Sequence, residues 1–189
     1  MDWDTIYRTR LLKEIPWHSE TPPKSLVIIA EKLKKGSVLD VCCGAGTNSI
    51  FLAKKGFKVK GIDISPKAIE IAKKRALEEK TKIDFKQGSV LGLEEKNSFD
   101  FILDRGCFHH IPWEQKPVFI KKIHSALRPN GKYLLIAFSE NDYSDKGISK
   151  EQIHMLFSGK FHIDRITETL RTEPSGKKRA LYNVILTKQ

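Results

Sequence analysis

A stretch of small residues near position 44 separates an apolar run from a helical pattern. Gly44 and Gly46 lie in it, and glycine lets the main chain approach a ligand closely because it has no Cβ atom. The first amide groups of the following helix then face the same ligand. Asp63 ends the next apolar run, about twenty residues on, where a carboxylate can accept hydrogen bonds from both hydroxyls of a ribose. The pattern predicts a site for an adenosine ligand, and a tight turn without a ligand is the alternative.

These residues leave the type of adenosine ligand open. The third glycine of the dinucleotide-binding fingerprint would fall at Ser49, so that fingerprint is incomplete. Both a dinucleotide and another adenosine cofactor remain compatible with the glycine loop and Asp63.

Alternating apolar runs and helical patterns predict the elements that position this loop. The expected strands are 37–42, 58–63, 83–87, 99–104, 132–138, 161–170 and 179–187. The expected helices are 23–34, 47–55, 66–80, 114–127 and 150–157, with a further amphipathic helix at 3–13. Such alternation predicts βαβ units and a largely parallel sheet. A turn signal at 174–176 predicts that the last two strands form an antiparallel pair at the end of the sheet.

The composition of the chain favours a single folded domain that spans residues 1–189. Hydrophobic residues make up 40% of the chain and charged residues 30%, as in soluble proteins. The first seventeen residues mix charged with apolar side chains, unlike a signal peptide or membrane span, so we expect a cytoplasmic protein without a membrane partner. The net charge of +11 could attract nucleic acid, but its lysines are scattered, and a solvated basic surface is favoured.

The chain has three cysteines, Cys42, Cys43 and Cys107. Because the number is odd and two of them are adjacent, a structural disulfide is not expected. Reduced thiols also agree with a cytoplasmic setting.

Four motifs resemble those of one enzyme family. They are 40–46 (DVCCGAG), 61–65 (GIDIS), 99–104 (FDFILD) and 127–132 (LRPNGK), and they span most of the chain in order. Together they resemble class I S-adenosylmethionine-dependent methyltransferases. The resemblance implies a transferase that uses S-adenosyl-L-methionine for methylation and releases S-adenosyl-L-homocysteine. It also implies an α/β fold, a Rossmann-like three-layer sandwich whose seven-stranded, mostly parallel sheet has an antiparallel last strand.

The resemblance also implies which positions contact the cofactor. The amino-acid end would lie among residues of the first motif, the ribose would be held by Asp63, and Ile64 would pack on the adenine. Two positions depart from the family pattern, since Cys42 replaces the first glycine of the motif and Ser89 stands where an adenine-binding Asp is common. The implied cofactor-binding residues are Trp17, Asp40, Cys42, Gly44, Ala45, Gly46, Asp63, Ile64, Ser89, Val90 and Asp104.

The N-terminal segment has a narrower resemblance. Trp3, Tyr7 and the Pro16-Trp17 pair are similar to the signature of the thiopurine, thiol and tellurite-resistance group of small-molecule methyltransferases. In that group the segment folds over the cofactor, so we expect 1–35 to form a helical cap on a core at 36–189. Simple packing of the tryptophans onto the core is the alternative.

The stretch after the fourth strand supplies candidates for the acceptor side of the site. With Tyr7 and Trp17, these are Arg105, His109 and His110. One histidine could accept a proton near neutral pH, although packing under a loop is the alternative role. Adjacent histidines point in different directions, so no metal site is expected. No catalytic residue is assigned, because the sulfonium already activates the methyl group and alignment is the main requirement.

The sequence therefore predicts methyl transfer to a small-molecule acceptor, such as a thiol or another soft or anionic nucleophile, by direct in-line displacement. The Asn/Asp-Pro-Pro-Tyr loop of many enzymes that methylate nitrogen is missing at 104–107, and no nucleic-acid module is appended. Methylation of RNA or protein is the alternative suggested by the net charge. A catalytically inactive, cofactor-binding regulatory protein is the alternative suggested by Ser89. The sequence does not indicate an oligomeric state.

Overall fold

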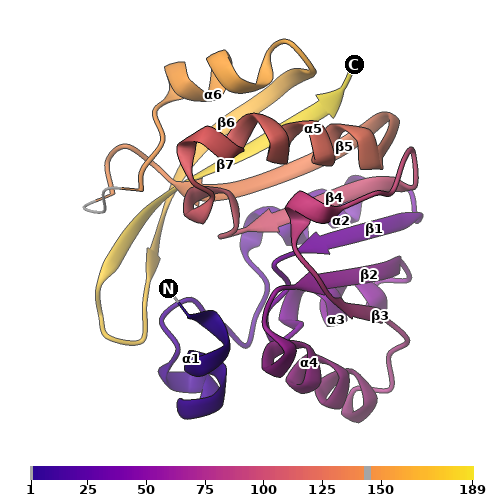
Figure 1. Cartoon of the computed structure of the whole chain (residues 1–189), viewed down its shortest axis with the longest axis vertical. Helices are drawn as coiled ribbons and strands as arrows, with labels where there is room; N and C mark the ends of the chain where they lie inside the picture. Colours follow the sequence, from indigo (N-terminus) through magenta and orange to yellow (C-terminus); the bar gives the residue numbers. More distant parts are fainter. Residues whose placement is uncertain (1, 143–145) are drawn as a thin grey trace.

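The computed structural model describes residues 2–142 and 146–189 of the chain, and the strands in this part form one seven-stranded sheet (Figure 1). The strands are β1 (Ser37–Val41), β2 (Lys58–Asp63), β3 (Asp84–Gln87), β4 (Phe99–Arg105), β5 (Leu127–Phe138), β6 (Phe161–Thr172) and β7 (Lys178–Lys188). The helices are α1 (Trp3–Thr9), α2 (Lys24–Lys32), α3 (Thr47–Lys54), α4 (Pro66–Glu78), α5 (Lys116–Ala126) and α6 (Lys150–Phe157). Short 3₁₀ helices occupy Leu12–Glu14, Val90–Gly92, Phe108–His110 and Trp113–Gln115.

The strands follow the order β3-β2-β1-β4-β5-β7-β6 across the sheet. The first five in this order pair in parallel, whereas β7 runs antiparallel to both β5 and β6. The predicted fold, with a reversed last strand and a terminal hairpin, is confirmed. Parallel strands place their carboxyl ends at one edge, which is where open α/β sheets bind their ligands.

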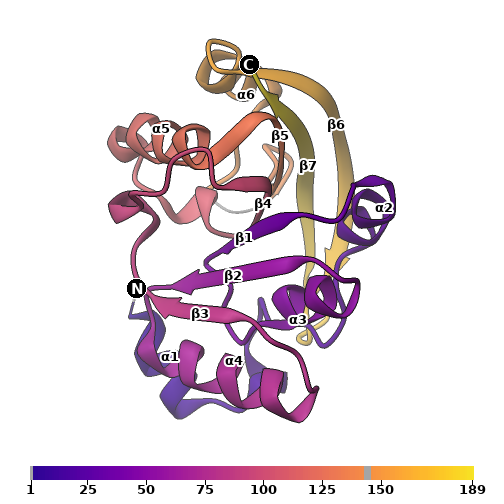
Figure 2. The same ribbon diagram turned by 90° about the vertical axis from the view of Figure 1, so that its right-hand side faces the viewer.

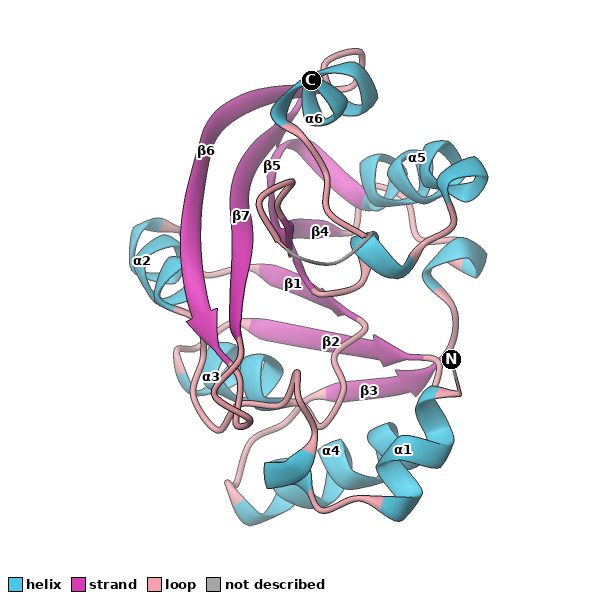
Figure 3. Ribbon diagram, turned by 90° about the vertical axis from the view of Figure 1, so that its left-hand side faces the viewer, coloured by secondary structure: helices cyan, strands magenta, loops and turns pink. Residues whose placement is uncertain are grey.

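Helices cover both faces of the sheet (Figures 2 and 3). On one face, α5 and α6 pack over Leu39, Ile102 and Tyr133, which are fully buried. On the other face, α2 and α3 pack over residues such as Phe101 and Leu103. Successive side chains of a strand point to opposite faces, so β4 contributes to both layers of the core. The three-layer sandwich follows from this alternation.

Several element boundaries differ from the prediction, most clearly at the first helix and around Leu127. The expected helix at 3–13 ends at Thr9, because Arg10 and Leu11 have extended backbones, and a 3₁₀ helix follows. The expected helix at 114–127 is the shorter α5, because Leu127 already pairs with Phe99 in the sheet. Register then shifts along β4, and the polar residues after Leu127 belong to the start of β5 instead of a loop.

The terminal hairpin and the N-terminal helix approach each other beyond the edge of the sheet. The hairpin of β6 and β7 extends past the carboxyl end of β5 toward the segment that carries α1 (Figure 1). A side-chain hydrogen bond from Arg171 in β6 to the carbonyl oxygen of Pro16 joins the two. Within the described residues, no helix has both the length and the apolar character needed to cross a membrane.

Candidate functional site

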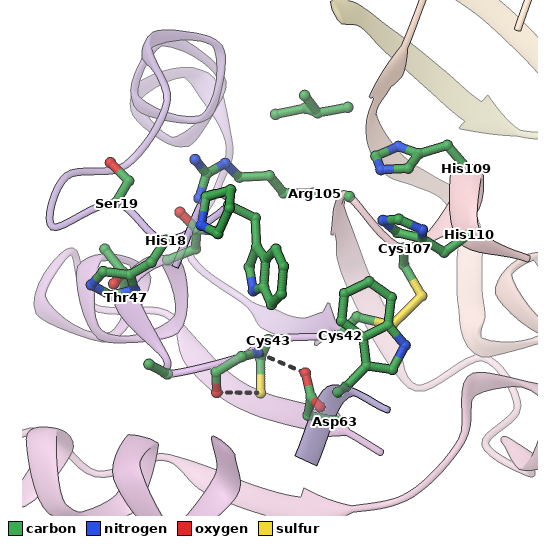
Figure 4. Close-up of a pocket in the computed structure, with 18 of the residues that line it drawn as sticks. His18, Ser19, Cys42, Cys43, Thr47, Asp63, Arg105, Cys107, His109 and His110 are labelled. Carbon is green, nitrogen blue, oxygen red and sulfur yellow. Dashed lines mark hydrogen bonds between the residues drawn. A yellow bond between two sulfur atoms is a disulfide. The ribbon is translucent and has the colours of Figure 1, made fainter. Parts of the chain in front are cut away.

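A cavity of about 570 Å³ lies at the carboxyl ends of the parallel strands (Figure 4). Its walls come from the N-terminal segment, from the loops after β1, β2, β3 and β4, and from the β6–β7 hairpin. Most of the residues predicted for the site line it, namely Tyr7, Trp17, Cys42, Gly44, Ala45, Asp63, Ile64, Ser89, Val90, Arg105, His109 and His110. The topology thus brings the predicted cofactor side and acceptor side into one space.

The glycine loop after β1 forms the floor of the cavity. Gly44 has φ 53° and Gly46 has φ 79°, a region that disfavours other residues. A Cβ atom added to Gly44 would lie 2.5 Å from the hydroxyl oxygen of Tyr7, and one added to Gly46 would lie 2.9 Å from the ring of Phe85. Both backbone geometry and close neighbours therefore require glycine at these two positions.

Asp63 contributes a carboxylate to the wall of the cavity. It is buried, and its Oδ2 accepts a hydrogen bond from the backbone N–H of Gly44 (2.8 Å) while its Oδ1 accepts one from Ser65 (2.9 Å). Each carboxylate oxygen keeps a lone pair for a further donor. Burial raises the pKa of Asp63, and hydrogen bonds from the backbone N–H groups of Ser65, Gly44 and Ile64 oppose that rise. The neighbouring Ile64 is 55% exposed and presents an apolar surface beside the carboxylate.

Three predicted cofactor residues, Asp40, Gly46 and Asp104, lie behind the walls of the cavity. The Asp40 carboxylate accepts a hydrogen bond from the hydroxyl of Ser49 (2.6 Å) beneath the glycine loop. Asp104 is fully buried and bonds to backbone N–H groups of the loop after β4. Burial raises the pKa of both carboxyls to about 7. In this structure, these side chains support the loops that line the cavity.

The N-terminal segment closes one side of the cavity through aromatic contacts. The indole N–H of Trp17 donates a hydrogen bond to the hydroxyl of Tyr7 (3.1 Å), and Trp3 packs edge-on against both Trp17 and His110. Burial raises the pKa of Tyr7, so its hydroxyl stays protonated at neutral pH.

The two histidines are held as neutral side chains. The Nδ1 atom of His109 accepts a hydrogen bond from the backbone N–H of Phe138 (3.3 Å), whose ring stacks on the imidazole. Burial and nearby positive charges lower the pKa of His109 well below its usual range, and that of His110 to about 4. A base that holds its proton so weakly is poorly matched to proton abstraction near neutral pH.

A disulfide bond in the cavity wall corrects the prediction of three reduced thiols. Cys42 and Cys107 are joined, with their Cα atoms 5.7 Å apart, and Cys43 is free and buried. The prediction was wrong because the two residues are 65 positions apart in sequence, yet β1 and β4 are neighbours in the sheet. The bond links the glycine loop to the loop after β4.

Several lining residues were missed in the sequence. Arg171 and Arg179 come from the hairpin, Lys146 from the segment before α6, and Asn48 from the start of α3. Sequence spacing alone gives no sign that the hairpin reaches the site. Asn48 could have been suspected, since it follows the glycine loop directly. In the described ranges, no group of three or more His, Cys, Asp or Glu side chains could hold a metal ion.

The cavity fits S-adenosylmethionine by the chemistry of its walls. Gly44 lines the cavity, and Asp63 offers acceptors for a ribose. The side-chain oxygen of the buried Asn48 has no hydrogen-bond partner within the described part of the chain. An apolar surface at Ile64 and Val90 completes the space that an adenine would occupy.

Comparison with known proteins identifies the family of the chain. The profile of the family described as "Methyltransferase domain" matches residues 38–131. An uncharacterized methyltransferase of Schizosaccharomyces pombe is 36% identical over 109 residues, which cover 57% of this chain and 75% of that protein. The 2-heptyl-1-hydroxyquinolin-4(1H)-one methyltransferase of Mycobacteroides abscessus is 30% identical over 160 residues, or 80% of this chain and 70% of that protein.

Solved structures share the fold. A structure from work on the conversion of a disulfide bond into a thioacetal group during echinomycin biosynthesis has a TM-score of 0.88 at 22% identity, covering 98% of this chain and 90% of that chain. TehB of Haemophilus influenzae has a TM-score of 0.77 at 19% identity, covering 89% and 63%. The chain therefore belongs to the class I S-adenosylmethionine-dependent methyltransferases, and S-adenosylmethionine is its methyl donor.

Proposed function

We propose that this enzyme methylates a small-molecule acceptor whose nucleophilic atom is soft or anionic, such as a thiolate. One observation carries the proposal. The cavity is enclosed by two covers, which are the N-terminal segment and the β6–β7 hairpin. Trp17 and Tyr7 close it from the N-terminal side, and Arg171 of the hairpin bonds to Pro16 of that same segment. A cavity shared between two such covers favours a small acceptor over a folded macromolecule.

The residues around the cavity support direct displacement without a dedicated base. The cofactor supplies a methyl group already activated by its sulfonium, and the acceptor's electron pair forms the new bond as the carbon–sulfur bond breaks. Tyr7 and Trp17 exclude water and restrict the approach of the acceptor. The low pKa values of His109 and His110 favour an acceptor that ionises without help from the protein.

Relatives of this chain support an acceptor of low molecular weight. The Mycobacteroides abscessus relative is named for a hydroxyquinolinone, and a Pelagibacter ubique relative, 39% identical over 99 residues, is named as a ubiquinone biosynthesis O-methyltransferase.

We also propose how the cofactor contacts the residues that line the cavity. Asp63 binds the ribose, and the glycine loop lies under the methionine. The residues around the adenine are Ile64, Ser89 and Val90.

The acceptor class is tested by methyl transfer from isotopically labelled S-adenosylmethionine. The panel contains thiols, phenols, N-hydroxy heterocycles, amines, RNA and unfolded protein. We expect turnover among the small soft or anionic compounds and no retention of RNA at physiological salt. Transfer to RNA, with steeply salt-dependent binding, would replace the proposal by RNA methylation. Cofactor binding without transfer to any acceptor would favour the regulatory alternative.

The placement of the cofactor is tested separately by calorimetry with S-adenosylhomocysteine. Replacing Asp63 with Ala removes the acceptor for the ribose, and the binding free energy should weaken by roughly 1 to 3 kcal/mol. Asp84→Ala is the matched control, because Asp84 is an exposed carboxylate on the edge strand β3, outside the cavity. Equal affinities for wild type and Asp63→Ala would contradict this placement.

A further inference from the structure

Arg105 is the last residue of β4, and its side chain lines the cavity. The described part of the chain offers its guanidinium no hydrogen bond and no ion pair. Burial, and then the positive charge of Arg171, lower the pKa of Arg105 to about 10, so it remains charged at neutral pH. A charged and largely desolvated group of this kind is unfavourable unless an opposite charge joins it.

The other two arginines of the cavity are engaged with protein atoms. Arg171 donates to the carbonyl oxygen of Pro16, and Arg179 pairs with Asp142 (3.0 Å) and Glu173 (2.9 Å). Among the residues that the structure describes, Arg105 is therefore the cavity arginine whose N–H donors all remain for a ligand. Its planar group of five N–H donors matches a carboxylate in a two-point arrangement.

The surroundings of Arg105 place it at the glycine loop. The groups whose charges act on it are Arg171, Asp40 and Tyr7. Asp40 lies under that loop through its bond to Ser49, and the hydroxyl of Tyr7 lies over Gly44. Figure 4 shows the Arg105 side chain extending toward His18, away from His109 and His110.

The order of the lining residues along the cavity indicates which part of a bound cofactor would lie next to Arg105. Ile64 and Val90 offer the apolar surface for the adenine, Asp63 stands where the ribose belongs, and Gly44 follows toward β4. The methionine part continues in that direction, and it ends in the only carboxylate of S-adenosylmethionine. Asp40 neutralises the charge of Arg105 only in part. Burial raises the pKa of Asp40 to about 7, so its carboxyl is only partly ionised at neutral pH.

We propose that Arg105 binds the α-carboxylate of the cofactor's methionine moiety, which makes it a cofactor-binding residue and not a residue of the acceptor side. The α-carboxylate of the cofactor would also interact with the positive charge of Arg171, and it would reduce the repulsion between the guanidinium groups of Arg105 and Arg171. This role is independent of the acceptor, so it stands whether or not the proposed acceptor class is correct.

The test compares two ligands by isothermal titration calorimetry with the full chain. S-adenosylhomocysteine carries the carboxylate, whereas 5′-methylthioadenosine lacks the whole amino-acid end. Arg105→Gln should weaken S-adenosylhomocysteine binding roughly 10- to 100-fold, the range for a hydrogen bond to a charged group. The same variant should bind 5′-methylthioadenosine as wild type does, which also shows that it is folded. Decarboxylated S-adenosylhomocysteine, which keeps the amino group, should be equally insensitive to the substitution.

Two further variants sharpen the comparison. Arg105→Lys keeps a point charge and should recover part of the lost affinity for S-adenosylhomocysteine. Arg165→Gln is the matched control, because Arg165 is an exposed arginine of β6 outside the cavity, and it should leave both affinities unchanged.

Three other results would contradict either the role proposed for Arg105 or the cofactor assignment. Unchanged S-adenosylhomocysteine affinity in Arg105→Gln, with a raised KM for an acceptor, would return Arg105 to the acceptor side and overturn the proposal. An equal loss of affinity for both ligands would also overturn it, because the effect would then be structural. Failure of the wild-type protein to bind either ligand would instead contradict the cofactor assignment itself.

Discussion

The carboxyl group of Asp104 organises the loop after β4 from within the core. Its Oδ1 accepts hydrogen bonds from the backbone N–H groups of Cys107 (2.9 Å) and Phe108 (3.4 Å), and its Oδ2 accepts one from the hydroxyl of Tyr133 (3.0 Å). Burial raises the pKa of Asp104 to about 7, although these hydrogen bonds oppose the rise. The folded protein therefore favours the neutral acid at pH values below 7.

We expect the free energy of unfolding to fall between about pH 4 and pH 7, and Asp104→Asn to reduce that fall. The folded pKa of about 7 lies above the ordinary value of 3.8, so this stabilisation is complete below about pH 4 and is lost as the pH rises through 7. Ionisation of the buried group removes up to about 4 kcal/mol. Urea unfolding at several pH values measures the slope, with Asp84→Asn as the exposed control. Identical slopes in wild type and Asp104→Asn would contradict the prediction.

At the scale of elements, α1 is attached to the start of α4 by one carboxylate. The Oδ1 atom of Asp4 accepts hydrogen bonds from the hydroxyl of Ser65 (2.7 Å) and from the backbone N–H of Lys67 (2.8 Å). Arg75 in α4 adds a second link, since it donates to Glu20 and to the carbonyl oxygen of Ala45. The N-terminal segment is thus fixed to the same loops that, in our proposal, hold the ribose and the methionine end of the cofactor.

Replacing Asp4 with Ala should loosen this segment without unfolding the sheet. Amide hydrogen exchange should accelerate at residues 3–19, whereas β1 and β4 stay protected, because local opening follows the loss of a few exposed contacts. S-adenosylhomocysteine should dissociate several-fold faster from the variant. Glu70→Ala is the control, since Glu70 is an exposed residue of α4 and its hydrogen bond among the described residues is to Lys67 of the same helix. Unchanged exchange at residues 3–19 would show that other contacts hold the segment.

At the scale of the whole molecule, the Cys42–Cys107 disulfide joins two parts of the cavity wall. It connects the loop after β1 to the loop after β4, which are distant in sequence. A cross-link over 65 residues restricts the unfolded chain and contributes up to about 4 kcal/mol to stability.

A thiol count tests the pairing directly. The denatured protein should react with one equivalent of an alkylating reagent before reduction, at Cys43, and with three after reduction. Cys107→Ser should give two equivalents in both conditions, because it releases Cys42. Reduction should also lower the midpoint of urea unfolding for wild type but not for Cys107→Ser. Three reactive thiols before reduction would contradict the bond.

The sequence alone determined the order of the elements and predicted the candidate cofactor half of the site, because both rest on local signals. Apolar periodicity sets strands and helices over a few residues, and glycines at 44 and 46 with Asp63 at the next strand end lie within one βαβ unit. Parallel pairing of β1 with β2 then brings Gly44 and Asp63 together with little further information.

Tertiary structure alone decided which side chains at the ends of strands face the cavity and which distant segments cover it. Along β4, alternation sends Asp104 toward Tyr133 in the core and leaves its neighbour Arg105 in the cavity, a choice that depends on register and helix packing. The contact of Arg171 with Pro16 spans 155 positions, and the partner of Cys42 is 65 positions away. Such contacts have no local signature, because they arise only when the sheet has placed its strands side by side.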